Sequence, residues 1–117
     1  MNVAEIMTPR ESLVTATLPG SREDVLDRLQ DNEFSSVPVV NGDTGAFRGL
    51  VSRERLIAEP EEDQLALLAE DVPTVPEDAT LAELAALIVE TRERRIPVVT
   101  DGDDGPRLAG LVTITDL

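Results

Sequence analysis

The sequence contains no cysteine, histidine, lysine, tryptophan or tyrosine, and its only aromatic residues are Phe34 and Phe47. Without histidine there is no imidazole base for neutral pH, and without cysteine there is no thiolate nucleophile, disulfide or soft-metal site. A phosphate-binding P-loop needs a lysine that this chain lacks. No base and nucleophile pair can be assembled, so we expect no enzymatic activity, no catalytic residue and no metal site.

Long hydrophobic runs are also missing. No apolar segment approaches the roughly 20 residues that a membrane-spanning helix needs. The first nine residues, Met1 to Pro9, lack the basic and then apolar pattern of a signal peptide. We therefore expect a soluble, cytoplasmic protein with no membrane partner.

Positive charge is scarce. The 117 residues include 24 Asp and Glu but only 10 basic residues, all of them Arg, which gives a formal net charge of −14. This excess of carboxylates argues against a nucleic-acid partner, because polyanion affinity depends on clustered cations. Since 41% of the residues are hydrophobic, the composition is typical of a globular protein adapted to high salt, which screens its self-repulsion.

The chain contains an internal repeat. Residues 35–42 (SSVPVVNG) match residues 94–102 (RRIPVVTDG), and each passage is followed by a second run, GLVS at 49–52 and GLVT at 110–113. An apolar stripe behind a Thr80-x-x-Glu83 capping box predicts a helix before the second passage, and Ser21 is the candidate N-cap of its counterpart. The stripes are Leu81, Leu84, Ala85 and Ile88 in the second half, and Val25, Leu26 and Leu29 in the first.

These elements predict an α/β fold of two β-α-β-β-α repeats that share a core about a pseudo-twofold axis. Short extended segments at 14–18 and 72–75 open the repeats, and Pro60 precedes a helix from about 61 to 69. We place the first repeat at 1–59, the connecting helix at 60–70 and the second repeat at 71–117. The second repeat ends where a final helix would follow, so we expect a truncated helix and a fragment of a longer protein.

Two acidic turns resemble the start of a calcium loop, namely residues 101–105 and, more weakly, 41–45. The twelfth position of such a loop requires a bidentate Glu, but Val112 and Ser52 stand there. We interpret both segments as solvated hairpin turns.

The ends of the second runs carry a hydroxyl, Ser52 in one repeat and Thr113 in the other. A hydroxyl at a strand-to-helix junction can bind a phosphate oxygen, and a carboxylate three residues later can accept hydrogen bonds from ribose hydroxyls. Asp116 supplies that carboxylate after Thr113, whereas Arg55 follows Ser52. The alternative, that both hydroxyls only cap helices, stays open.

The repeated combination of Val-Pro-Val-Val or Ile-Pro-Val-Val, a Gly-rich turn and Gly-Leu-Val-Ser/Thr resembles a pair of cystathionine-β-synthase (CBS) domains, the Bateman module. The opening phrase at 6–9 (IMTP) also matches it. The resemblance covers nearly the whole chain. It implies a regulatory module that needs no cofactor and binds AMP, ADP, ATP or S-adenosylmethionine in clefts between the repeats. It also implies a homodimer.

The resemblance implies two sites, each with its hydroxyl and carboxylate from one repeat and its adenine-facing wall from the other. The better-matched site comprises Thr113, Asp116, Val14, Thr15, Ser35, Ser36, Val37 and Arg95, with Phe34 at the start of the wall segment. The weaker site comprises Ser52, Arg55, Val72, Thr74, Arg94 and Ile96, and there Arg55 replaces the ribose-binding Asp of the family.

Three of the ten arginines, Arg92, Arg94 and Arg95, lie within four residues. We expect Arg94 or Arg95 to contact phosphate, because an acidic protein must concentrate cations locally to hold a polyphosphate. Ion pairing with Glu90 or Glu93 at a helix end is the alternative.

Two other functions remain open. The first is a ligand-free module that only holds the subunits of a larger protein together. The second is a hydrolase, which no set of side chains in the sequence supports.

Overall fold

The computed structural model describes the backbone of residues 1–32 and 35–116 and the side chains of residues 1–30 and 35–115. Contacts divide the chain into two units: unit 1 contains Met1–Leu13 and Val72–Leu117, and unit 2 contains Val14–Asp71. Unit 2 is therefore inserted in the sequence of unit 1.

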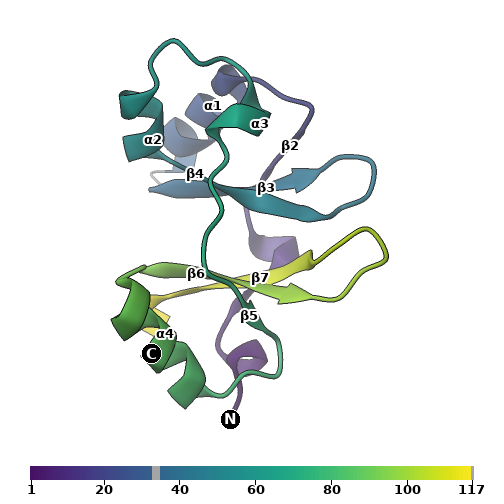
Figure 1. Cartoon of the computed structure of the whole chain (residues 1–117), viewed down its shortest axis with the longest axis vertical. Coiled ribbons are helices and arrows are strands. Elements are labelled where there is room, and N and C mark those ends of the chain that lie inside the picture. The colour runs from purple at the N-terminus through teal and green to yellow at the C-terminus, as the bar shows by residue number, and fades with distance from the viewer. Residues whose placement is uncertain (33–34, 117) are drawn as a thin grey trace. The chain divides into compact units, whose positions relative to one another are not determined.

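Unit 2 is a three-stranded sheet covered on one face by helices (Figure 1). The sheet has the order β2-β3-β4, with β2 parallel to β3 and β3 antiparallel to β4. The elements are β2 (Ala16–Leu18), α1 (Arg22–Asn32), β3 (Ser36–Asn41), β4 (Phe47–Ser52), α2 (Arg53–Ala58) and α3 (Leu65–Leu68).

Unit 1 contains a four-stranded sheet of order β1-β7-β6-β5. Strand β5 is parallel to β6, while β7 is antiparallel to both β6 and β1. The elements are η1 (Val3–Glu5), β1 (Thr8–Pro9), η2 (Arg10–Ser12), β5 (Val75–Pro76), α4 (Leu81–Thr91), β6 (Arg95–Thr100), β7 (Arg107–Thr113) and η3 (Ile114–Asp116). Here η denotes a 3-10 helix.

The predicted repeat and α/β class are confirmed, because β2-α1-β3-β4 and β5-α4-β6-β7 have the same order and strand directions. Even the irregularities match. A bulge follows Val39 opposite Gly49, and another follows Val98 opposite Gly110. Val98 lies 59 residues after Val39, and Gly110 lies 61 residues after Gly49, so the bulges occupy equivalent positions in the two repeats.

The predicted capping box at the start of α4 is confirmed. The Thr80 hydroxyl accepts a hydrogen bond from the Glu83 N–H at 3.1 Å, and the Glu83 carboxylate accepts one from the Thr80 N–H at 3.4 Å. The helix predicted at about 61–69 is shorter than expected and covers only Leu65–Leu68.

In each sheet, a segment from outside the β-α-β-β element lies against the last strand of that element, next to a glycine. The N–H and carbonyl of Leu50 both bond to Glu70, at 3.0 and 2.9 Å, and β1 lies against β7 at Gly110. A Cβ atom built on Gly49 would lie 2.5 Å from the Glu70 carbonyl oxygen, and one on Gly110 would lie 2.5 Å from that of Thr8. Glycine is required at both places because a side chain would collide with backbone.

Pro38 lies inside β3, directly opposite Leu50. Because both backbone groups of Leu50 point toward Glu70, the Pro38–Leu50 pair exchanges no ladder hydrogen bonds. The missing N–H of proline therefore removes no hydrogen bond between β3 and β4. Pro97 has the same place opposite Leu111 in unit 1, where Leu111 pairs with Thr8 on its other side.

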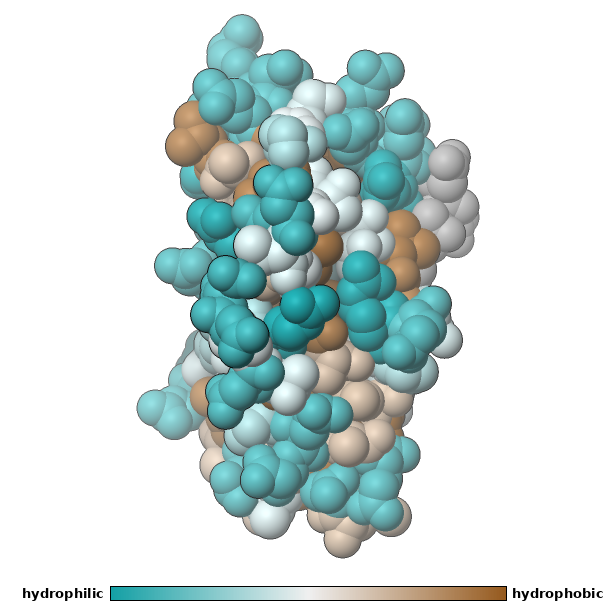
Figure 2. Space-filling view, turned by 90° about the vertical axis from the view of Figure 1, so that its right-hand side faces the viewer, coloured by the Kyte–Doolittle hydropathy of each residue, from teal (hydrophilic) through white to brown (hydrophobic). Residues whose placement is uncertain are grey.

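Hydrophilic residues cover most of the face shown in Figure 2, and hydrophobic residues appear there as small separate patches. In the part of the chain that the structure describes, no helix combines the length and the apolar character that crossing a membrane requires.

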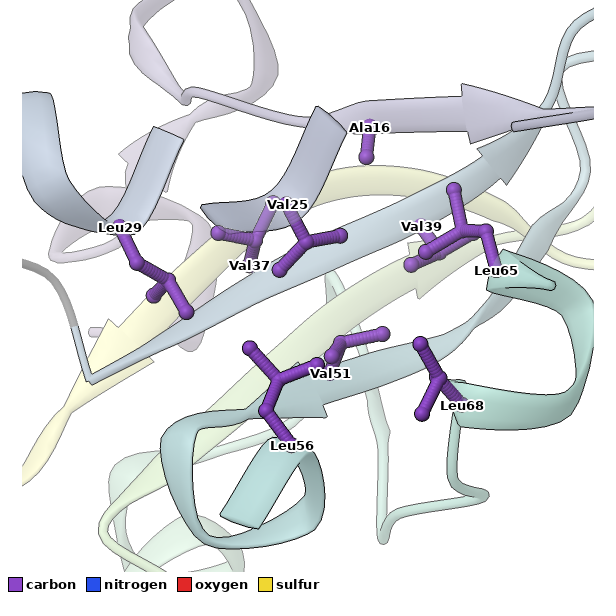
Figure 3. Packing of buried hydrophobic residues seen from close by; sticks show 9 residues of the cluster. All are labelled: Ala16, Val25, Leu29, Val37, Val39, Val51, Leu56, Leu65 and Leu68. Atoms are coloured by element: carbon purple, nitrogen blue, oxygen red, sulfur yellow. The ribbon is translucent and has the colours of Figure 1, made fainter. Parts of the chain in front are cut away.

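Among the described residues, each unit has its own hydrophobic core, so the prediction that the two repeats share one core was wrong. In unit 2 the helices pack aliphatic side chains onto one face of the sheet (Figure 3). The core of unit 2 consists of Ala16, Val25, Leu29, Val37, Val39, Val51, Leu56, Leu65 and Leu68. That of unit 1 consists of Val3, Val75, Ala79, Leu84, Ile88, Ile96, Val98 and Val112. None of the core residues that the structure describes is aromatic.

Candidate nucleotide-binding junctions

The unit 1 junction is the place where β7 leads into η3, beside the start of β6. It brings a cation and a hydroxyl together. Arg95 and Thr113 are register partners across the antiparallel pair, and the next partners are Ile96 and Val112. Ile96 and Val112 are fully buried in the core beneath α4. Because side chains alternate between faces along a strand, Arg95 and Thr113 lie on the opposite face of the sheet.

Backbone and hydroxyl contacts hold the turn after Thr113. The Ile114 N–H donates to the Arg94 carbonyl oxygen at 2.9 Å. The Thr113 and Thr115 hydroxyl oxygens are 2.8 Å apart and share a hydrogen bond. Thr115 was not predicted as a site residue, although its spacing of two from Thr113 is the signal that could have pointed to it. A helix of only three residues follows, so side chains rather than a helix dipole must hold an anion here.

Burial lowers the pKa of Arg95, because the low-dielectric surroundings disfavour its charged form. Its neighbour Arg94 is exposed. Arg92 has a structural role: it ends α4 in the left-handed conformation, with φ of 62°, and its N–H donates to the Ile88 carbonyl oxygen at 2.7 Å. The partly desolvated Arg95 is thus the cation of this cluster best suited to an anionic ligand.

The remaining residues of the better-matched predicted site fall in both units. Asp116 is the last residue of η3, and its side chain lies outside the described residues, as does Phe34. Val14 and Thr15 precede β2 in unit 2, where the Thr15 carbonyl oxygen accepts a hydrogen bond from Arg28 Nε at 2.7 Å. The joining of these two groups of residues in one site stays a prediction.

The predicted wall segment of that site has mixed surroundings in unit 2. Ser35 is exposed, Ser36 is buried on β3, and Val37 belongs to the hydrophobic core. The side chain of Val37 is therefore not available to a ligand.

The unit 2 junction is the place where β4 leads into α2. It has the same backbone hydrogen bond as the unit 1 junction but different side chains. Ser36 lies opposite Ser52, and the Arg53 N–H donates to the Ser35 carbonyl oxygen at 3.1 Å. The Ser52 hydroxyl caps α2 by accepting a hydrogen bond from the Arg55 N–H at 3.0 Å. The capping role left open for this serine is thus present in the structure.

The other residues of the weaker predicted site lie in unit 1. Ile96 is buried in the core, Val72 is half-buried and Thr74 is exposed. Thr74 lines an open hollow of about 380 Å³ at the ends of β5 and β6, which Glu77, Asp78 and Asp101 also border. This hollow was not predicted from the sequence.

The acidic turns of both units are held by protein contacts. Asn41 Oδ1 accepts hydrogen bonds from the N–H groups of Asp43 and Thr44, at 2.8 and 3.0 Å. The Gly105 N–H donates to the Gly102 carbonyl oxygen at 3.2 Å. Among the described residues there is no group of three or more acidic side chains arranged to hold a metal ion.

A family model, that of the CBS domain, matches residues 3–62 and 66–117. The chain belongs to the CBS domain family. Its two matched segments are the two repeats found in the sequence, and in the structure each contributes a β-α-β-β element. The CBS resemblance predicted from the repeated motifs is therefore confirmed.

Individual relatives agree with this assignment. The chain is 31% identical over 125 residues to UPF0053 protein MT1890 of Mycobacterium tuberculosis (strain CDC 1551 / Oshkosh), covering 100% of this chain but only 26% of that protein. The chain thus spans about a quarter of the length of this relative.

Two solved structures are similar over nearly the whole chain. One is CBSX2 in complex with AMP, with a TM-score of 0.82, 28% identity, and coverage of 98% of this chain and 91% of that one. The other is the CBS domain of the bacterial CNNM/CorC family Mg2+ transporter in complex with ATP, with a TM-score of 0.81, 26% identity, and coverage of 99% and 83%.

Proposed function

We propose that this CBS pair is a non-catalytic regulatory module that binds an adenosine-containing ligand through the unit 1 junction. The observation that supports this most directly is the pairing of Arg95 with Thr113 on the face of the sheet opposite α4. A guanidinium and a hydroxyl side by side form two or more hydrogen bonds with a phosphate group.

Charge explains why this junction suits a phosphate. The chain carries a net charge of −14, so most of its surface repels anions. Arg95 is partly removed from water, which lowers its pKa and strengthens its attraction for a counter-charge. Binding a phosphate there compensates the desolvation of the cation.

The ligand class follows from the junction and from the similar structures. CBSX2 and the CNNM/CorC domain hold AMP and ATP, respectively. S-adenosylmethionine has no phosphate and carries a positive sulfonium. We therefore expect the Arg95 and Thr113 pair to favour AMP, ADP or ATP over S-adenosylmethionine.

The regulatory mechanism is a shift in population. A ligand that binds one arrangement of the module more tightly than another stabilises that arrangement by its difference in affinity. An attached domain or partner then responds to the changed population. The cytoplasmic location and the homodimer stay predictions from the sequence.

The competing function is a ligand-free structural module. The unit 2 junction favours it locally, because Ser52 caps its own helix and Arg55 stands in place of an acid. The Arg95 and Thr113 pair of the unit 1 junction argues against a ligand-free module.

Titration calorimetry in about 2 M KCl with AMP, ATP and S-adenosylmethionine tests the proposal. We expect binding of AMP or ATP, and a loss of roughly tenfold or more in affinity for Arg95→Gln, because a hydrogen bond to a charged group is removed. Thr113→Val should weaken binding as well. Arg48→Gln is the matched control, since Arg48 is exposed on β4 and the charge change is the same. If no ligand binds the wild-type chain, the structural module is the better description.

A further inference from the structure

The two junctions share a backbone design but differ at two side-chain positions. Arg95 in unit 1 corresponds to Ser36 in unit 2, because each lies opposite the junction hydroxyl. Three residues after the hydroxyl, unit 1 has Asp116 and unit 2 has Arg55. The unit 2 junction therefore has neither a guanidinium opposite its hydroxyl nor a carboxylate three residues after it.

Arg55 is fixed in unit 2 by contacts with two other parts of the chain. Its Nη2 donates to the Leu67 carbonyl oxygen of α3 at 3.0 Å, and its Nη1 lies 3.6 Å from the Glu59 carboxylate. Its backbone N–H donates to the Ser52 hydroxyl. These contacts join the first turn of α2 to α3, so the Arg55 side chain has a structural role within unit 2.

This arrangement is unfavourable for binding a ribose. Its hydroxyl groups donate well to a carboxylate, whereas a guanidinium has five donors and no acceptor. Arg55 Nε is buried and has no hydrogen-bond partner among the described residues, so the guanidinium is held in place although this donor finds no acceptor there. Moving it aside for a nucleoside would also break the bond to Leu67.

We propose that Arg55 locks α2 to α3 and closes the unit 2 junction to nucleosides, so that the chain takes up one nucleotide and not two. This inference rests on the proposed function for its stoichiometry. The lock itself is independent of that function.

The first experiment measures stoichiometry with AMP and ATP, by calorimetry and by native mass spectrometry in a volatile salt. We expect one equivalent per chain, which binds more weakly in Thr113→Val. Two equivalents in the wild-type chain, or one equivalent that binds Thr113→Val as tightly as the wild-type chain, would overturn the inference. A wild-type chain that binds nothing would contradict the proposed function, and the second experiment would then decide whether the lock exists.

The second experiment compares Arg55→Met with Arg48→Met, which each lose one positive charge and keep a long side chain. We expect Arg55→Met to melt lower by roughly 4 °C or more and to show faster hydrogen exchange at the α3 amides of Leu68 and Ala69. Equal melting and equal exchange in the two variants would show that no lock exists.

Discussion

Arg95 and Thr113 are direct partners across β6 and β7, at the last pair of the antiparallel ladder. Opposed side chains in such a ladder have Cβ atoms only about 4.5–5.5 Å apart. The strand pairing itself therefore places the guanidinium-bearing and hydroxyl-bearing side chains together, without help from a flexible loop. This placement is the basis of our proposal that the pair binds an anion.

Arg95→Gln should not lower the melting temperature below that of Arg48→Gln. Burial lowers the pKa of Arg95 relative to the unfolded chain, so its charged form opposes folding at every pH below the folded pKa, including neutral pH. Removing the charge relieves that penalty. Thermal melts in high salt check this, and a melting temperature several degrees below the control would mean that Arg95 mainly stabilises the fold.

Gly110→Ala should destabilise unit 1 by about 1–3 kcal/mol, because the new Cβ would meet the Thr8 carbonyl oxygen and force the two strands apart. Urea unfolding measures the change. Gly105→Ala is the comparison: a Cβ there meets nothing within 4 Å, although the φ of +115° strains any side chain. A smaller loss at Gly110 than at Gly105 would contradict the close approach of β1 to β7.

Arg22→Lys should destabilise unit 2 by about 1–2 kcal/mol, because one ammonium group cannot reproduce the fork of a guanidinium. Arg22 donates to the carbonyl oxygens of Leu56 at 2.7 Å and Glu59 at 2.8 Å. Urea unfolding at constant salt measures the loss, with Arg48→Lys as the control on an exposed arginine. Equal stability of the two variants would show that the fork contributes nothing.

Raising KCl from about 0.1 to 2 M should raise the melting temperature, because the Debye length falls from about 10 Å to below 3 Å and the net charge of −14 is then screened. The double variant Asp103→Asn and Asp104→Asn carries two fewer negative charges and should respond less steeply. A melting temperature that does not change with salt would refute adaptation to high salt.

Local signals predicted α4 well. The stripe that includes Leu84 and Ile88 defines its buried face, and Thr80 and Glu83 form the capping box expected from their spacing. Each of these features depends on residues within one or two helical turns. The matching pair of β-α-β-β elements followed from the repeat for the same reason, because each half supplies its own turn and strand residues.

The helix predicted at 61–69 was too long, and the cause is not local. The Asp63 carbonyl oxygen accepts a hydrogen bond from the Arg22 N–H at 2.8 Å, and the Leu65 N–H donates to the Gly20 carbonyl oxygen at 3.0 Å. Backbone groups that a longer helix would use are thus bonded to the start of α1. Helix propensity cannot anticipate such a competitor from more than 40 residues away.

In the candidate site, too, features with a local sequence signal were predictable, and features set by distant contacts were not. Thr113 and Arg95 could be selected from the sequence because of their residue types and the repeat, but their direct opposition depends on strand register. The contact of Arg55 with Leu67 was not predictable, because the acceptor is a backbone carbonyl that carries no sequence signal. The sequence showed only that an acid was missing there.

The insertion of residues 14–71 within unit 1 sets an order of events during synthesis. The ribosome releases the whole of unit 2 before it has made the strands that residues 1–13 need as neighbours. Unit 2 can reach its native contacts early, whereas the N-terminal segment must wait, unpaired, until β7 emerges. Residues 1–13 are thus translated before unit 2 but reach their native contacts after it.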